Sequence, residues 1–208
     1  TIPHKIDIIP LLDKTSENVR EMGACNTLYR DGEKICGENT DVIGFTAPLR
    51  KRSLPPETRV LVLGAGGVSR AAIAGLRRLG LANITLTNRR KERAEALCNE
   101  FGLLCAPWEE RGDVPADLII NTTPLGMTGA QEHETPYPRA FQDNGIAYDL
   151  IYTPFQTRFL RDAAAAGWEP VSGLDMFIGQ GDAQFHLWTG HHLPEEAITA
   201  VTSALYGQ

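Results

Sequence analysis

The middle of the chain alternates short apolar segments with longer segments of helical spacing, and this alternation limits the fold more than any other feature. Residues 59–63 (RVLVL), 83–88 (NITLTN), 118–121 (LIIN) and 146–150 (IAYDL) are typical of buried strands. Short apolar strands that alternate with amphipathic helices predict a parallel sheet with helices on both faces. We therefore expect a doubly wound α/β domain, a Rossmann domain, over residues 43–173.

The helices of this domain end at glycines, and the two ends of the chain follow a different pattern. We expect helices at 69–79, 91–101 and 155–166, and a last strand at 169–171. Residues 1–42 predict a helix near 15–22 and two strands, 26–30 and 34–37, joined by an Asp31-Gly32 turn. Residues 174–208 predict C-terminal helices, with Pro194 suited to begin the last one. The ends thus predict a partial α/β substrate domain, to which the C-terminal helices return.

Charge and cysteine spacing exclude several classes of protein. A net charge of −6 over 208 residues argues against nucleic-acid binding, which depends on clustered Lys and Arg. The four cysteines have no Cys-x-x-Cys spacing, and the irregularly spaced His186, His191 and His192 do not predict a metal site. No segment has the ~20 apolar residues needed to span a bilayer, and the first residues do not form a signal peptide. We expect a cytoplasmic protein with no membrane partner.

A glycine-rich turn joins the first strand of the domain to its first helix. The residues are Gly64, Ala65, Gly66, Gly67 and Val68. Glycines at this place allow a tight turn and let the backbone approach a pyrophosphate, which the N-terminus of the helix then binds. A turn of this kind is a weak signal by itself, but between a strand and a helix it predicts a dinucleotide site.

The end of the second strand indicates which dinucleotide is bound. An NAD site usually has an acidic residue about 20 residues after the glycines, which binds the ribose 2′-hydroxyl. This chain has Asn88, Arg89, Arg90 and Arg93 there instead. Arginine matches the oxygens of a 2′-phosphate, whereas cations are unfavourable at the N-terminus of a helix that binds nothing. The sequence therefore predicts NADP as the cofactor.

Six further segments carry a resemblance to a known family. They are TIPHK (1–5), GACNTL (23–28), GENTDVIG (37–44), NTTPLGM (121–127), YDLIY (148–152) and GLDMFIGQ (173–180), which leads into QFHLWTG (184–190). This ordered set resembles the shikimate dehydrogenase family over essentially the whole chain. The resemblance implies an NADP-dependent oxidoreductase that interconverts shikimate and 3-dehydroshikimate in aromatic amino-acid biosynthesis, on the pathway to chorismate.

The resemblance also implies the residues that act on the substrate. Oxidation of a secondary alcohol needs a base or proton relay within hydrogen-bond reach of the hydroxyl. In the family, the Lys of Thr-x-Pro-x-Lys and the Asp of Asn-Thr-Asp do this work, and they match Lys5 and Asp41. Shikimate carries several hydroxyls and a carboxylate, and the implied substrate-binding residues are Thr1, Lys5, Asn26, Asp41, Tyr152 and Gln180.

For the cofactor, the resemblance implies three groups of contacts. The glycine turn lies on the pyrophosphate, and Asn88, Arg89, Arg90 and Arg93 lie at the 2′-phosphate end. The residues implied near the ribose and the nicotinamide are Asn121, Thr122, Leu150, Gly173 and Met176.

The chain departs from the family pattern before its first motif. The family has a further segment there, which supplies most of the substrate domain's sheet and a Ser-x-Ser motif for the substrate carboxylate. Because this sequence begins at the motif, we expect Thr1–Lys5 to form a strand without a partner and the carboxylate anchor to be lacking.

Two alternatives to a shikimate dehydrogenase stay open on the sequence. One is a quinate or shikimate-like dehydrogenase that acts on a related cyclohexane acid. The other is a catalytically silent module that binds NADP without turnover. The sequence does not fix the oligomeric state, and a homodimer is left open.

Overall fold

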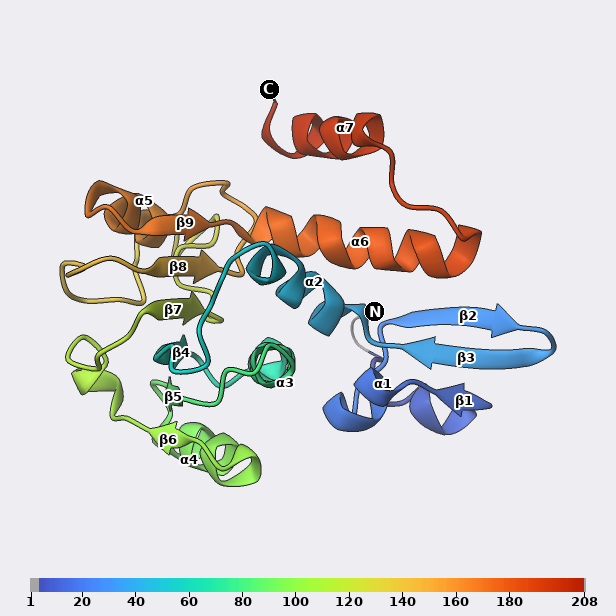
Figure 1. The fold of residues 1–208 in the computed structure, drawn as a ribbon, viewed down its shortest axis with the longest axis horizontal. Coiled ribbons are helices and arrows are strands. Elements are labelled where there is room, and N and C mark those ends of the chain that lie inside the picture. The colour runs from blue at the N-terminus through green and yellow to red at the C-terminus, as the bar shows by residue number, and fades with distance from the viewer. Residues whose placement is uncertain (1–3, 208) are drawn as a thin grey trace.

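Six short strands pair in parallel to form the main sheet of the computed structural model, which describes residues 4–207 (Figure 1). The strand order is β6-β5-β4-β7-β8-β9. The four residues of β4 and of β7 are all buried, as expected for the centre of a sheet with both faces covered. The strands are β4 (Val60–Leu63), β5 (Ile84–Thr87), β6 (Leu104–Cys105), β7 (Leu118–Asn121), β8 (Ile146–Asp149) and β9 (Glu169–Val171).

Helices cover both faces of this sheet and bury two separate apolar cores. Helices α3 (Gly67–Arg78) and α4 (Lys91–Phe101) pack on one face, where Ile73 and Leu97 lie in a cluster with the side chains of β4 and β5. Helix α5 (Arg158–Ala165) packs on the other, where Phe159 lies in a cluster with β4, β7 and β8. The single turn η2 (Trp108–Glu110) borders the same second core.

The strand order creates a crevice between β4 and β7. From β4 the chain proceeds outward to β5 and β6, and it then returns to begin β7, β8 and β9 on the opposite side. Ligands of doubly wound sheets bind at such a reversal, beyond the carboxyl ends of the strands. The glycine turn after β4 and the polar residues after β7 both lie there.

A second, smaller lobe is built from the N-terminal part of the chain (Figure 1). Its sheet has the order β1-β3-β2, in which β2 and β3 form an antiparallel hairpin and β1 pairs with β3 in parallel. The elements are η1 (Ile9–Leu11), β1 (Lys14–Thr15), α1 (Glu17–Met22), β2 (Thr27–Asp31) and β3 (Lys34–Glu38).

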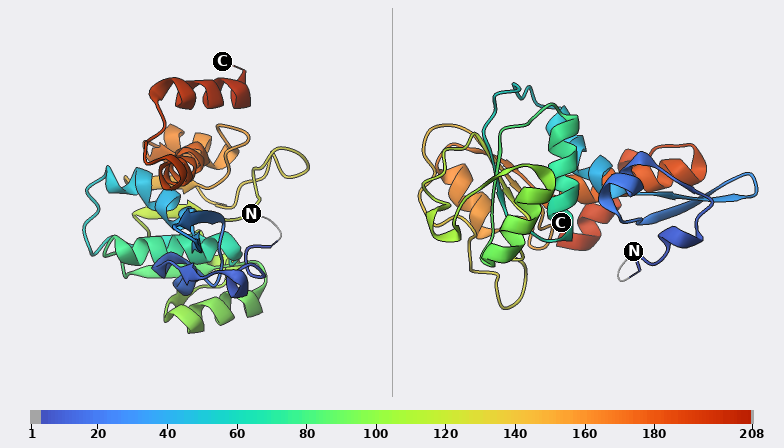
Figure 2. Two further views of the ribbon diagram at one scale, coloured as in Figure 1. Left: turned by 90° about the vertical axis from the view of Figure 1, so that its right-hand side faces the viewer. Right: turned by 90° about the horizontal axis from the view of Figure 1, so that it is seen from below.

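Two helices that cross closely join the lobes, and a third closes the chain (Figure 2). Helix α2 (Thr40–Arg50) packs against α6 (Gly173–Thr189), and a Cβ on Gly44 would lie only 2.5 Å from the carbonyl oxygen of Met176. This glycine therefore permits a helix contact that brings the start of α2 beside the middle of α6. Helix α7 (Glu195–Tyr206) follows Pro194, the residue expected at its start.

The predicted fold class is confirmed, and the strands and helices expected for the main sheet are present. Helix α2 and the short strands β1 and β6 were not predicted. The expected N-terminal strand is wrong for its described residues, because His4 has no regular structure and Lys5 begins a turn. No described strand pairs with these residues, and a strand without a partner leaves its backbone groups unpaired. Residues 1–3 lie outside the described part of the chain.

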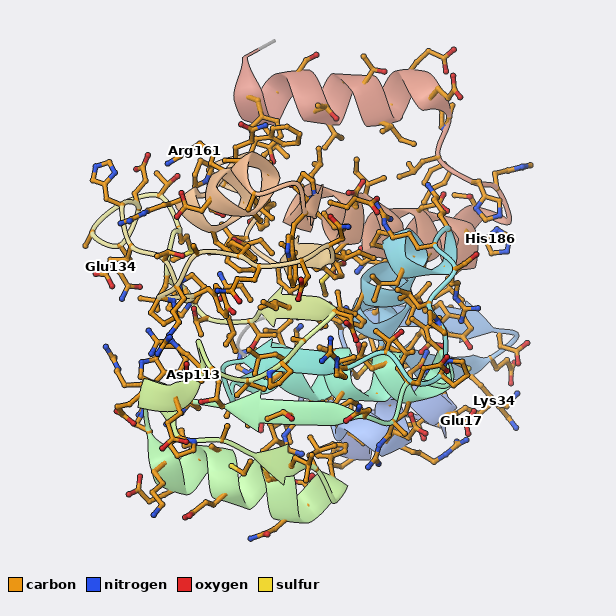
Figure 3. The ribbon with its side chains drawn as sticks, turned by 60° about the vertical axis from the view of Figure 1, so that its left-hand side comes forward. Glu17, Lys34, Asp113, Glu134, Arg161 and His186 are labelled. Carbon is orange, nitrogen blue, oxygen red and sulfur yellow. The ribbon has the colours of Figure 1, made fainter. Side chains whose placement is uncertain are left out.

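Many charged side chains lie on the outside of residues 4–207. Charged residues such as Glu17, Lys34, Asp113 and Arg161 project outward (Figure 3). All four cysteines are free. In the described part of the chain, no helix is long and apolar enough to cross a membrane.

Candidate active site

The larger of two cavities at the carboxyl edge of the sheet lies between the lobes and has a volume of about 1100 Å³. Both lobes and both joining helices contribute to its walls. The predicted substrate residues Lys5, Asn26, Asp41, Tyr152 and Gln180 all line it. The sixth predicted residue, Thr1, lies outside the described residues.

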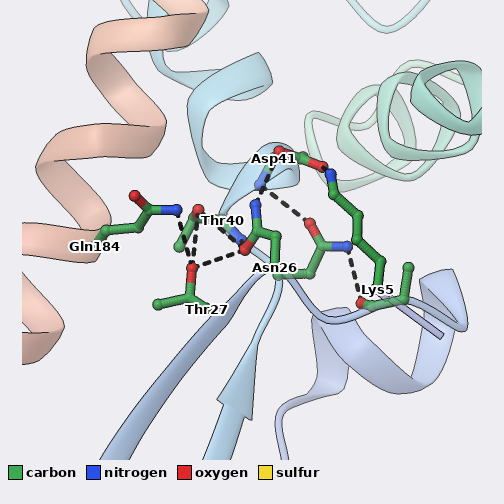
Figure 4. A network of polar contacts seen from close by, with 8 residues as sticks. Lys5, Asn26, Thr27, Thr40, Asp41 and Gln184 are labelled. Atoms are coloured by element: carbon green, nitrogen blue, oxygen red, sulfur yellow. Dashed lines mark hydrogen bonds and ion pairs between the residues drawn. The ribbon is translucent and has the colours of Figure 1, made fainter. Parts of the chain in front are cut away.

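Lys5 and Asp41 form an ion pair in this cavity (Figure 4). Asp41 lies in the first turn of α2, whose N-cap Asn39 accepts a hydrogen bond from the Asp41 backbone N–H at 3.0 Å. The Lys5 Nζ donates to Asp41 Oδ2 at 2.7 Å, and Asn26 Nδ2 donates to Asp41 Oδ1 at 2.9 Å. The side chains are 28% and 17% exposed, so both groups are accessible from the cavity and shielded from bulk water.

The Asn26 side chain is held in one orientation by its own partners. Its Oδ1 accepts from the Thr40 backbone N–H at 2.9 Å and from the Thr27 hydroxyl at 2.7 Å. The amide nitrogen must therefore face Asp41. On the far side of this network, Gln184 Nε2 donates to Thr27 Oγ1 at 3.1 Å (Figure 4).

Residues of α6 and of the loop after β8 complete the cavity. The ring of Tyr152 stacks on Phe177 with centroids 4.9 Å apart, and it is 42% exposed. Gln180 and Gln184 lie one helical turn apart and both line the cavity. The walls thus present a cation, a carboxylate, amides and a phenol, which is the set of groups that a small hydroxylated acid requires.

The glycine turn after β4 has one position where only glycine fits. Gly64 has a φ of +116°, and a Cβ there would lie 2.5 Å from the Thr122 hydroxyl oxygen. The Gly66 backbone N–H donates to Ser69 Oγ, which lies 2.7 Å from the same Thr122 oxygen. These bonds fasten the N-terminus of α3 to the end of β7, in the crevice where a pyrophosphate would bind.

The smaller cavity, of about 220 Å³, is lined by the arginines predicted to bind the 2′-phosphate. Besides the first three residues of the glycine turn, Asn88, Arg89, Arg90, Arg93 and Thr122 line it. Within residues 4–207, no carboxylate forms an ion pair with Arg89, Arg90 or Arg93. Three cations that no acidic side chain neutralises fit a 2′-phosphate and would repel one another without an anion.

The remaining cofactor residues lie on the opposite side of the glycine turn. Gly67, Val68, Leu150, Gly173 and Met176 line the large cavity. A Cβ on Gly173 would lie 2.5 Å from the carbonyl oxygen of Ile151, so glycine lets α6 begin against the loop after β8. A dinucleotide that lies across the turn would therefore place one end in each cavity, and the residues present fit NADP.

Asn121 lines neither cavity, although the resemblance implied that it contacts the cofactor. Its side chain is fully buried, donates to Asp149 Oδ1 at 3.0 Å and accepts from the backbone N–H of Thr123 at 2.9 Å. Asp149 also accepts from Thr157 Oγ1 at 2.6 Å and from the Ile151 N–H at 3.0 Å. Burial raises the pKa of Asp149 to about 7, and these hydrogen bonds oppose the shift. The network supports the loop that carries Leu150 and Tyr152.

Sequence reasoning missed several residues of the two cavities. Gln184 could have been found from its spacing of four residues after Gln180 on one helix. Phe177 stands in the quoted segment 173–180 but was given no role there, whereas Arg70 and Trp108 carried no motif, and the tertiary structure brings all three to the cavity walls. The histidines have a partner that spacing did not suggest: His192 Nδ1 lies 2.8 Å from Asp182 Oδ2, and its ring stacks on His186. No group of three or more metal-ligating side chains is found among the described residues.

Comparisons with known proteins agree with this geometry. A model of the family described as shikimate / quinate 5-dehydrogenase matches residues 49–110, and one of the shikimate 5′-dehydrogenase C-terminal domain matches residues 173–201. A shikimate dehydrogenase (NADP(+)) of Pelobacter propionicus is 54% identical over 99% of this chain and 75% of its own length.

Two solved structures have the same fold. The shikimate 5-dehydrogenase of Thermus thermophilus, in complex with NADP(H) and shikimate, is 37% identical with a TM-score of 0.84, over 99% of this chain and 77% of that one. A quinate dehydrogenase of Corynebacterium glutamicum, in complex with NAD, is 29% identical with a TM-score of 0.85, over 99% and 76% of the two chains.

Proposed function

The chain belongs to the shikimate dehydrogenase family, and we propose that its large cavity is the active site, with Lys5 and Asp41 as the proton relay. The reaction is the NADP-dependent interconversion of shikimate and 3-dehydroshikimate, a step of aromatic amino-acid biosynthesis. The observation that carries the proposal is the 2.7 Å contact between Lys5 Nζ and Asp41 Oδ2, in the cavity that Leu150, Gly173 and Met176 also line.

The ion pair suits proton transfer at a carbinol. When bound, NADP supplies the hydride acceptor for oxidation and the hydride donor for reduction. During reduction, the Lys5 ammonium donates a proton to the carbonyl oxygen as negative charge develops there, and during oxidation the Lys5 amine accepts it. Asp41 holds Nζ in place and stabilises its charged form. Because Asn26 fixes the Asp41 carboxylate, the relay has its geometry before the substrate binds.

The other predicted polar residues recognise the hydroxyls of the substrate. Asn26, Tyr152 and Gln180 line the same cavity as the relay, and Gln184 joins them. A site built to hydrogen-bond hydroxyls rejects an analogue that lacks one, because a polar group of the site then stays unpaired. We assign substrate selection to this set.

The cofactor is held at both sides of the glycine turn. Residues 64–68 bind the pyrophosphate, Asn88, Arg89, Arg90 and Arg93 bind the 2′-phosphate end, and Thr122, Leu150, Gly173 and Met176 border the ribose and nicotinamide. For Asn121 we propose support of the loop after β8 in place of a direct contact.

The proposal also covers how the chain divides into domains and in which compartment the protein acts. Residues 1–42 and 174–208 belong to the substrate domain and 43–173 to the NADP-binding domain, with α2 running across the first boundary. We expect the protein to act in the cytoplasm on a small-molecule substrate. A homodimer stays an open prediction.

The test is a comparison of kcat/KM in the full-length protein for shikimate and quinate, each with NADP⁺ and NAD⁺. We expect the pair of shikimate and NADP⁺ to be used best by at least tenfold. Higher activity on quinate would transfer the assignment to the quinate branch of the family. Binding of NADP without turnover of either acid would rule out both dehydrogenases and support the catalytically silent NADP-binding module.

A further inference from the structure

Trp108 lies at the junction of two cavities and is not explained by the residues assigned so far. It lines the 220 Å³ cavity that holds the arginines, and it also lines a neighbouring cavity of about 450 Å³. Asn88 and Arg89 are the other residues that border both. A large aromatic side chain thus stands beside the residues proposed to bind the 2′-phosphate.

The Trp108 ring is fixed on one side by Arg111. The guanidinium carbon of Arg111 lies 3.9 Å from the ring centroid, a close cation–π contact. Arg111 is itself held by hydrogen bonds from Nε to the Pro136 carbonyl at 2.6 Å and from a terminal nitrogen to the Trp108 carbonyl at 2.5 Å. Burial lowers the pKa of Arg111.

Because Arg111 lines neither cavity, the part of the indole that faces them is the part that the guanidinium leaves uncovered. The indole N–H of Trp108 has no hydrogen-bond partner among residues 4–207, whereas those of Trp168 and Trp188 each donate to a backbone carbonyl. The ring is therefore rigidly placed, flat and open on its cavity side.

The covalent structure of NADP determines which part of it lies near the open face of the Trp108 ring. The adenine ring is attached to the same ribose that carries the 2′-phosphate, so it must lie within one sugar of Asn88 and the arginines. The remaining apolar walls there are Trp108, Pro124 and Leu125. Of these, only Trp108 offers a flat π-face that matches a purine.

We propose that Trp108, backed by Arg111, is the stacking platform for the adenine ring of NADP. This inference rests on the proposed function, in that it requires the arginine cavity to bind the adenosine end of the cofactor. It assigns two tasks to neighbouring residues: Trp108 recognises the base, which NADP and NAD share, and the arginines recognise the phosphate, which only NADP carries.

The experiment compares Trp108→Ala and Trp108→Phe with the wild-type full-length protein, using NADP, NAD and adenosine 2′,5′-bisphosphate as ligands. Base stacking on an aromatic side chain predicts that Trp108→Ala weakens binding of all three by a similar factor of about tenfold. Trp108→Phe should recover most of the affinity. The loss of affinity should appear both in the Kd of each ligand and in the KM for NADP⁺.

A spectroscopic signal separates stacking from a structural effect of the substitution. Adenosine 2′,5′-bisphosphate has no nicotinamide, so quenching of tryptophan emission by this ligand reports contact with the base. We expect quenching in the wild type and in the control Trp188→Phe, and none in Trp108→Phe.

Two negative results are distinguishable. Unchanged affinity in Trp108→Ala, or quenching that persists in Trp108→Phe, would overturn the platform while leaving NADP binding intact. Absence of binding of the bisphosphate to the wild type would instead overturn the proposed cofactor site itself.

Discussion

The two cavities differ in how their charged groups are balanced. In the large cavity, Lys5 is paired with Asp41, and Asn26 satisfies the second carboxylate oxygen. In the small cavity, the described chain offers Arg89, Arg90 and Arg93 no acidic partner. A cation paired with a carboxylate is suited to exchange a proton with a substrate, whereas unpaired cations are suited to bind an anion. The difference supports the proposal that the large cavity performs the chemistry and the small one selects the cofactor.

The largest effect is expected from the ion pair of Lys5 and Asp41. Lys5→Ala removes the proposed proton-transfer group and should lower kcat for shikimate oxidation by ~10²–10⁴-fold, with the affinity for NADP unchanged. The matched control is Lys14→Ala, since Lys14 forms a similar 2.7 Å ion pair with Asp31 on the exposed surface. Near-normal turnover in Lys5→Ala would remove this residue from the mechanism.

Substitutions among the arginines of the small cavity should change the affinity for NADP and the preference for NADP over NAD. Replacing Arg89 and Arg93 together by Gln removes two charge-assisted contacts of ~1.5–3 kcal/mol each, so NADP affinity should fall by about 10²-fold or more. NAD affinity should change little, because it has no 2′-phosphate. Replacing Arg158 and Arg161, both on α5, by Gln controls for the same change in net charge. An equal loss for both cofactors would show that the arginines do not read the phosphate.

The third prediction compares the stability effects of two alanine substitutions in the glycine turn between the cavities. Gly64→Ala places a Cβ at positive φ against Thr122, and we expect it to lower the free energy of unfolding by about 1–3 kcal/mol. Gly66→Ala should cost much less, because Gly66 has a φ of −95° and nothing lies within 4 Å of its added Cβ. Chemical denaturation measures the free energy of unfolding of both variants. Equal destabilisation by the two substitutions would contradict this prediction.

The last effect depends on pH and concerns Asp149, a buried carboxyl that belongs to neither cavity. Its pKa of about 7 in the folded protein exceeds the ordinary value of 3.8, so the folded state binds more protons than the unfolded state between those values. Stability from this group is thus greatest below the unfolded pKa and is lost as the pH rises through about 7.

Asp149→Asn should remove this contribution. Denaturation measured from about pH 5 to about pH 8 should show a smaller fall in stability for the variant than for the wild type, by on the order of a few kcal/mol at most. Identical pH dependence of the two proteins would mean that Asp149 stays ionised throughout, held by Asn121, Thr157 and the Ile151 N–H.

The sequence predicted the main sheet well, because its signals are local. Helix α4 begins at Lys91 and ends at Phe101, as its spacing and the following Gly102 indicated. Helix α2 could not be found this way, since Gly44 and Pro48 weaken its helical pattern. It forms because Asn39 caps it, which is a local effect, and because Gly44 lets it pack against α6, which depends on tertiary structure.

Motifs predicted the residues of the candidate site, but not the residues that hold them in place. Lys5, Asp41 and the arginines stand in recognisable segments, so each could be named from the sequence. Gln184 reaches Thr27 from 157 positions away, and Arg111 is held beside the Trp108 ring by the carbonyl of Pro136, 25 positions further on. Contacts of this kind depend on how elements pack, which spacing along the chain does not encode.

The central claim is that this protein moves hydride between the substrate in the large cavity and the cofactor that lies across the glycine turn. The most direct measurement uses shikimate deuterated at the carbinol carbon that becomes the ketone, with NADP⁺ and the full-length protein. We predict that the deuterium appears in the reduced cofactor. Formation of reduced cofactor without the label, or no reduction while NADP binds, would contradict it.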